Sequence, residues 1–146
     1  MEHEKRDIIV VEDNPNDAEL MVRSLKKNNL ANKLVVLEDG EQALDYIFCT
    51  GEYKGRDSSV LPNVIFLDLK LPKVNGLEIL KKVKSNDKTK MIPVVIVTSS
   101  KEDPDIKAAY EFGANSYVVK PVDFTKFKET INQLGLYWIV VNENYK

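Results

Sequence analysis

Five short apolar runs, separated by stretches with helical periodicity, constrain the fold of this chain more than any other feature. Most runs are apolar at consecutive positions, which is typical of strands buried on both faces of a parallel sheet. We therefore expect five parallel strands. The runs are Ile8–Val11, Leu34–Leu37, Val64–Leu67, Val94–Val97 and Tyr117–Val119.

The segments that follow these runs carry apolar residues at the spacing of a helix face. We predict that Asn14 caps the first helix with Pro15 at its first position, and that Asp103 caps the fourth helix with Pro104 at its start. Gly113 is expected to end the fourth helix. The five apolar stripes are Ala18, Met21, Val22 and Leu25; Ala43, Leu44, Ile47 and Phe48; Leu77, Leu80 and Val83; Ile106, Ala109 and Tyr110; and Phe124, Phe127, Ile131 and Leu134.

This alternation of strand and helix predicts an α/β fold. Right-handed crossover connections place helices on both faces of the sheet. Of the two common doubly wound orders, the five-stranded flavodoxin-like order 2-1-3-4-5, with five helices, suits a chain of 146 residues. Such folds place their site at the carboxyl ends of the strands. We therefore expect the chemistry where strands 1, 3, 4 and 5 end.

The length suits one domain with one core. We expect residues 1–146 to form that single domain, with a core of about 7–134, a surface loop over 49–63 and an apolar extension over 135–146. The extension has two interpretations, because it can continue the fifth helix over the protein's own core or form a dimer seam. We favour the dimer, because Tyr137, Trp138 and Val140–Val141 continue beyond the last expected helix.

Composition narrows the functional class. The 21 basic and 23 acidic residues are interleaved and give a net charge of -2, so no basic face for direct DNA binding is visible. Cys49 is the only cysteine, which excludes an internal disulfide and fits a reducing compartment. Apolar runs are too short to cross a bilayer, and Met1–Asp7 lacks a signal-peptide pattern. We expect a cytoplasmic protein without a membrane segment.

Polar residues follow four of the predicted strands. Glu12 and Asp13 end the first, Asp68 the third, Thr98 the fourth and Lys120 the fifth. Clustered carboxylates repel one another unless a cation neutralises them, and oxygen ligands beside a phosphate favour Mg²⁺. A carboxylate beside a cation, a lysine and a hydroxyl is suited to phosphoryl transfer through an acyl phosphate.

These motifs carry a family resemblance. Over Ile8–Leu134 the chain resembles the receiver domains of two-component response regulators. The matching stretches, in order, are Val10-Val11-Glu12-Asp13-Asn14, Val64–Pro72 with Asn75-Gly76, Val97-Thr98-Ser99, and Tyr117–Pro121.

The resemblance implies a role for each site residue. Asp68 would be the phospho-acceptor. Glu12 and Asp13 would be the acidic pair, with Asp13 a direct ligand of the metal ion and Glu12 acting largely through water. The backbone carbonyl of Lys70 would be a further metal ligand. The implied ion is Mg²⁺, for which Mn²⁺ or Ca²⁺ can substitute.

The remaining roles concern the switch. Thr98 would supply the switch hydroxyl, Lys120 the lysine that contacts the phosphoryl group, and Tyr117 the aromatic switch residue. Gly76 would relieve the turn after the acceptor. Two positions depart from the family pattern: Ser99 stands where a smaller residue is usual, and Lys70 places a long basic side chain near the site.

The implied function is a signalling switch rather than an enzyme, apart from its own phosphorylation and dephosphorylation. A sensor histidine kinase would supply the phosphoryl group, and output would pass to a protein target or a phosphotransfer protein. The homodimer that the apolar tail suggests would use the fourth helix, the fifth strand, the fifth helix and the tail. The long loop over 49–63 resembles that of single-domain regulators that partner bacterial phytochromes.

Other functions fit less well. A binding module with the receiver fold could signal without phosphorylation, but degenerate receivers usually lose the acceptor, the acidic pair or the lysine, and this chain has them all. A phosphatase of the haloacid-dehalogenase type requires a second Asp two residues after the nucleophile, where this chain has Lys70. A dinucleotide-binding domain requires a glycine-rich turn after the first strand, and that turn is Glu12–Pro15.

Overall fold

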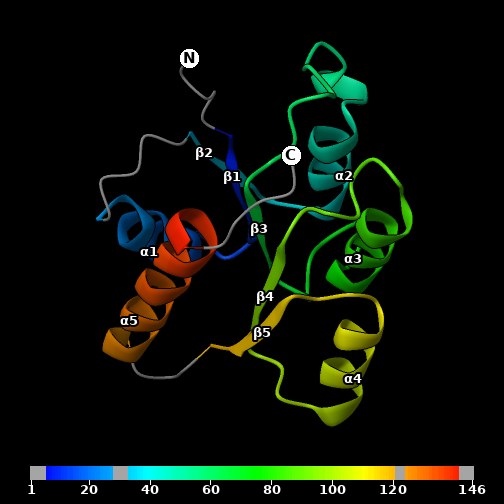
Figure 1. Ribbon diagram of the computed structural model, residues 1–146. Helices are drawn as coiled ribbons and strands as arrows, with labels where there is room; N and C mark the ends of the chain where they lie inside the picture. Colours follow the sequence, from blue (N-terminus) through cyan, green and yellow to red (C-terminus); the bar gives the residue numbers. More distant parts are fainter. Residues whose placement is uncertain (1–5, 28–32, 121–123, 142–146) are drawn as a thin grey trace.

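The computed structural model describes residues 6–27, 33–120 and 124–141, and within them a five-stranded parallel sheet. The strand order is β2-β1-β3-β4-β5, which confirms the predicted topology. All neighbouring strands pair in parallel, so their carboxyl ends meet at one edge of the sheet (Figure 1). The strands are β1 (Ile8–Val11), β2 (Leu34–Leu37), β3 (Val64–Leu67), β4 (Val94–Thr98) and β5 (Ser116–Val119).

Within these described residues, five α-helices cover both faces of the sheet. Helices α1 and α5 pack side by side on one face, and α2, α3 and α4 lie on the other (Figure 1). The helices are α1 (Pro15–Lys26), α2 (Gly40–Phe48), α3 (Gly76–Ser85), α4 (Asp103–Glu111) and α5 (Phe124–Gly135). Among the described helices, none is long and apolar enough to cross a membrane.

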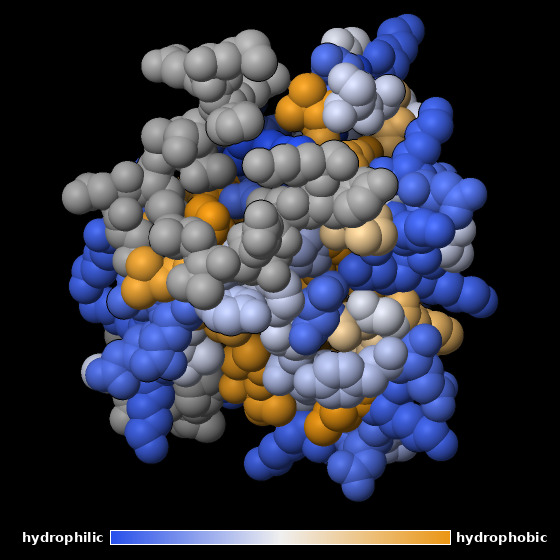
Figure 2. All heavy atoms as spheres, viewed as in Figure 1, coloured by the Kyte–Doolittle hydropathy of each residue, from blue (hydrophilic) through white to orange (hydrophobic). Residues whose placement is uncertain are grey.

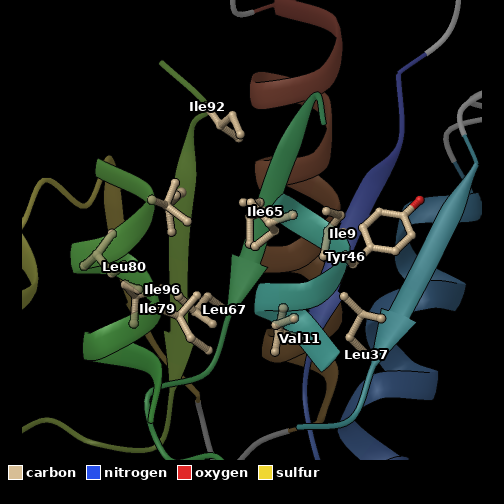
Figure 3. Close-up of a cluster of buried hydrophobic side chains, with 14 of the residues drawn as sticks. Ile9, Val11, Leu37, Tyr46, Ile65, Leu67, Ile79, Leu80, Ile92 and Ile96 are labelled. Atoms are coloured by element: carbon tan, nitrogen blue, oxygen red, sulfur yellow. The ribbon is translucent and has the colours of Figure 1, made fainter. Parts of the chain in front are cut away.

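The core has two layers, because alternate residues of the central strands point to opposite faces. Ile9, Ile65 and Ile96 pack on the side of the sheet that α2 and α3 cover. Figure 3 shows Ile96 near Ile79 of α3, and Ile9 near Tyr46 of α2. The residues between them in β1 and β3, Ile8, Val10, Val64 and Phe66, pack with α1 and α5. Burial on both faces explains why these strands are apolar at consecutive positions.

The helix boundaries mostly agree with the predictions. Asn14 caps α1, where its side chain accepts hydrogen bonds from the backbone N–H groups of Asn16 and Asp17. Gly113, with φ of 102°, follows the end of α4. The predicted cap of α4 is wrong by one residue: the carbonyl of Glu102 accepts the first helical hydrogen bond, and Asp103 is already helical.

The segment over 49–63 is mostly exposed, in agreement with the predicted surface loop. It contains a 3₁₀ turn, η1 (Gly51–Tyr53), and ends in the buried Pro62 and Asn63. Within it, Arg56 stacks over the Tyr46 ring at 4.0 Å and donates two hydrogen bonds to the Tyr46 carbonyl. The loop is therefore fixed to the end of α2.

The apolar tail continues α5 as a π-helical segment, η2 (Leu136–Val141). Trp138 and Ile139 pack partly against the core layer beneath α1 and α5. Leu136 and Tyr137 remain 40% and 50% exposed. Part of the tail thus covers the protein's own core, and part remains available for contact with a partner.

Candidate functional site

The carboxyl edge of the sheet holds the predicted site residues on rigid backbone. The hydrogen-bond ladder extends one residue beyond three strands: Glu12 N–H donates to the Leu37 carbonyl, Asp68 N–H to the Val11 carbonyl and Lys120 N–H to the Thr98 carbonyl, at 2.7–3.1 Å. Each functional side chain therefore begins at a position set by strand pairing. This is the convergence expected from the strand order.

Lys120 is the centre of the site. Its Nζ donates to Asp68 Oδ2 at 2.9 Å and to Glu12 Oε1 at 2.5 Å. Glu12 is buried among these partners, and the Lys120 side chain is only 12% exposed. One ammonium thus ties the end of β5 to the ends of β1 and β3.

Burial and charge act in opposite directions on these groups. Burial, together with the negative charge of Asp68, raises the pKa of Glu12 to about 7. The hydrogen bond from Lys120 lowers this pKa, but by less than burial raises it. For Lys120, burial acts to lower the pKa, but the hydrogen bonds to the three carboxylates outweigh it and raise the pKa above its ordinary value. The ammonium is therefore fixed as a cation.

Three carboxylates at this edge can hold a divalent cation. Ligand oxygens of Glu12, Asp13 and Asp68 all lie within 4.8 Å of one another. An all-oxygen donor set with several negative charges suits a hard cation. A cation there would also relieve the repulsion that remains when one ammonium faces several carboxylates.

The loop after β3 shapes the pocket around Asp68. The Asp68 Oδ1 atom accepts a hydrogen bond from Lys70 N–H at 3.2 Å, while the Lys70 side chain is exposed. Gly76 N–H donates to the Leu69 carbonyl at 2.8 Å, and a Cβ atom at position 76 would lie 2.2 Å from the Asp68 carbonyl oxygen. Only glycine permits this close approach.

Thr98 and Tyr117 lie on β4 and β5 beside these groups. Thr98 is fully buried, and its hydroxyl accepts a long hydrogen bond, 3.4 Å, from Ser100 N–H. Tyr117 is half-buried, and its hydroxyl donates to the Ser100 carbonyl at 2.8 Å. Ser100 thus connects the two side chains predicted to form the switch.

Asp17 belongs to the site and was missed by the sequence analysis. It lies in the first turn of α1, and its Oδ2 accepts a hydrogen bond from Lys120 Nζ at 2.9 Å. An acid in the first turn of a helix is common, because it complements the helix dipole, and this hides its second role. The available signal was its position one turn after Asp13, on the helix that leaves the site.

Comparison with known proteins decides the family. Residues 8–132 match the family described as the response regulator receiver domain. This chain belongs to the response regulator receiver family. Its members are signalling proteins, so the site lies on a signalling domain rather than on a classical enzyme.

One relative is similar to this chain over most of its length. Response regulator Rcp1 of Synechocystis sp. is 35% identical over 132 residues, which cover 90% of this chain and 88% of Rcp1. The crystal structure of its Mn(2+)-bound form has a TM-score of 0.90 and 32% identity, covering 97% of this chain and 99% of that one.

Two further structures agree. The phosphorylated cyanobacterial phytochrome response regulator RcpA has a TM-score of 0.91 and 29% identity, covering 98% of this chain and 100% of its own. The bacteriophytochrome response regulator AtBRR has a TM-score of 0.75 and 50% identity, covering 97% and 100%. The chain is therefore similar along its length to receivers of the phytochrome type, and the flavodoxin-like fold is confirmed.

Proposed function

We propose that the chain is a phosphorylation-activated switch in which Asp68 accepts a phosphoryl group from a sensor histidine kinase. The observation that carries this proposal is the 2.9 Å hydrogen bond from Lys120 Nζ to Asp68 Oδ2, inside a cluster of carboxylates able to hold a cation. A nucleophilic carboxylate held beside a fixed ammonium is arranged to form and stabilise an acyl phosphate.

In the proposed transfer, the bond formed to phosphorus is matched by the bond that breaks. An Asp68 carboxylate oxygen attacks the phosphorus of a phosphohistidine, the P–N bond breaks, and its electron pair remains on the imidazole. Lys120 then offers a hydrogen bond to a phosphoryl oxygen, and Thr98 offers its hydroxyl to another. A divalent cation, which we propose to be Mg²⁺ with Mn²⁺ or Ca²⁺ as substitutes, would supply charge neutralisation, held by Glu12, Asp13, Asp68 and the Lys70 carbonyl.

The switch would act through Thr98 and Tyr117. Movement of Thr98 toward the phosphoryl group would withdraw its hydroxyl from Ser100, whose carbonyl anchors Tyr117. Loss of the bond to Thr98 would let Ser100 and its carbonyl move away from the Tyr117 hydroxyl, and Tyr117 would then turn inward and change the surface of α4, β5 and α5. Figure 2 shows apolar and weakly polar side chains over β5, flanked by strongly polar ones on α4 and α5; Val119 and Tyr110 are 36% and 52% exposed.

The relatives support a proposal for the partners. Because the similar structures include phytochrome response regulators, we propose a kinase of the phytochrome class as the phosphoryl source. Output would pass to a protein target or a phosphotransfer protein, in a cytoplasmic setting and without direct DNA binding. The domain would act as one unit over residues 1–146.

Intact-mass spectrometry tests the function. The wild type and Asp68→Asn are incubated with acetyl phosphate, with and without Mg²⁺. We expect a gain of about 80 Da, the mass of one phosphoryl group, in the wild type with Mg²⁺ only. If a folded wild type gains no mass from acetyl phosphate or from a phosphorylated histidine kinase, the proposal is wrong, and a phosphorylation-independent binding module replaces it.

A further inference from the structure

Asp17 differs from the other carboxylates that contact Lys120. Glu12 and Asp68 are 2% and 8% exposed in their side chains, but Asp17 is 32% exposed. It also lies outside the group of carboxylates close enough to share a metal ion. Asp17 therefore contacts the ammonium from the solvent side, where a phosphoryl donor would approach.

The hydrogen bonds of Lys120 leave no donor free. An ammonium has three N–H donors, and Glu12, Asp17 and Asp68 each accept one. A phosphoryl oxygen that binds Lys120 must therefore replace one of these acceptors.

Asp68 carries the phosphoryl group and can keep its other carboxyl oxygen beside Lys120, so the choice lies between Glu12 and Asp17. Of these two, Asp17 is the easier to replace. Breaking the bond to Glu12 would leave a deeply buried group without its partner, which is costly. Asp17 is partly exposed, so water can solvate it after release. Its place in the first turn of α1, at the positive end of the helix dipole, also stabilises the released carboxylate.

We propose that Asp17 is a positioning residue that competes with the phosphoryl group for Lys120, an inference that rests on the proposed phosphorylation of Asp68. While Asp68 is unmodified, Asp17 occupies the solvent-side donor of Lys120 and adds a negative charge to the path of the anionic donor. When the phosphoryl group arrives, Asp17 releases Lys120. Phosphorylation is thus coupled to loss of a contact between α1 and the end of β5.

The substitution that tests this leaves the helix cap intact. The cap of α1 uses the backbone N–H of Asp17, which donates to Asn14 Oδ1 at 3.1 Å, and not its side chain. Asp17→Asn therefore removes the charge without removing the cap. Glu19→Gln is the matched control, because Glu19 lies on the same helix, is 60% exposed and pairs with Arg23 at 2.7 Å. Asp17→Glu restores a carboxylate.

The measurement is the initial rate of phosphorylation against acetyl phosphate concentration, by intact mass at saturating Mg²⁺. Loss of one partly exposed ion pair predicts an apparent KM lowered roughly two- to fivefold in Asp17→Asn, with a smaller change in the maximal rate. Glu19→Gln is expected to match the wild type, and Asp17→Glu to return KM toward it. A structural role alone would lower stability and slow the reaction instead.

Each contrary outcome has a clear meaning. An unchanged or raised KM in a folded Asp17→Asn protein overturns the competition, as does an equal fall in Glu19→Gln, which would indicate overall charge. A wild type that takes up no phosphoryl group overturns the proposed function, and this inference with it. A phosphorylated wild type with the same KM as Asp17→Asn overturns the inference alone.

Discussion

At the scale of single residues, an excess of carboxylates over cations governs the site. Among the described residues, Lys120 donates to Glu12, Asp17 and Asp68. Asp13 shares the cation-binding cluster but receives none of these hydrogen bonds. Its charge therefore adds repulsion to the free protein and attraction for a cation.

Asp13→Asn should accordingly have opposite effects with and without a divalent cation. Without the cation, we expect the free energy of unfolding to rise by roughly 0.5 kcal/mol, a small gain because Asp13 is exposed. With Mg²⁺ at about 100 times its Kd, the wild type should gain about 2.7 kcal/mol, and the variant far less. Urea denaturation with EDTA or Mg²⁺ measures both. A variant that gains as much as the wild type from Mg²⁺ would show that Asp13 is no ligand.

At the scale of elements, the loop between β3 and α3 depends on Gly76. A side chain there would collide with the backbone at Asp68, which cannot move without moving the acceptor. We expect Gly76→Ala to lower the free energy of unfolding by about 2 kcal/mol and to slow phosphorylation. Thermal unfolding and intact mass measure the two effects.

Gly55 provides the matched control for that substitution. A Cβ atom at Gly55 would meet no atom of the described part of the chain within 4 Å. Gly55→Ala should leave phosphorylation unchanged and stability equal or up to about 1 kcal/mol higher. Equal effects of the two alanines on phosphorylation would contradict the role of the close approach at Gly76.

The end of α2 contains a second backbone constraint. Cys49 has φ of 56°, in the left-handed region that glycine adopts without strain, and its N–H closes the helix onto Asp45 and Tyr46. Cys49→Gly should raise the free energy of unfolding by about 1 kcal/mol, as measured by denaturant midpoints. Cys49→Ala also removes the thiol but keeps the strain, so it should show no such gain. A gain shared by both variants would assign the effect to the thiol.

At the scale of the whole molecule, the sequence was sufficient to predict the features that follow from strand order and hydrophobic periodicity. Five apolar runs were enough for the sheet, because a parallel sheet buried on both faces leaves a distinctive pattern. Strand order then brought Glu12, Asp68 and Lys120 together at one edge. Pairwise contacts between a helix side chain and the site were not predictable in this way, which is why Asp17 was missed.

Other differences have local causes. Helix α4 begins one residue earlier than predicted, at Asp103, because the backbone carbonyl of Glu102 accepts the first helical hydrogen bond. Asp103 has the more favourable capping side chain, but it is not the cap. The loop over 49–63 is mostly exposed, as its composition predicts, but the stacking of Arg56 on Tyr46 that fixes it was not predicted. Tertiary contacts of this kind leave no periodic signal in a sequence.

The apolar tail contains a candidate dimer contact. Trp138 packs against the core and holds Tyr137 by an edge-to-face contact, with ring centroids 5.0 Å apart. The Tyr137 ring is thereby presented to solvent on a fixed support, the arrangement of an interface anchor. We predict that the protein forms a homodimer and that Tyr137→Ser raises the dimer Kd about tenfold, because tyrosine is enriched among the few interface residues whose truncation costs more than about 1 kcal/mol.

Sedimentation velocity over a range of concentrations measures this prediction. Met91→Ser is the control, since Met91 is also about half exposed, at 49%, but precedes β4 at the opposite edge of the sheet from the site. The control should keep the wild-type Kd. A wild type that remains monomeric, or a Tyr137→Ser variant with unchanged Kd, would refute the dimer seam. The tail would then act within one chain, where Trp138 and Ile139 close the core between α1 and α5.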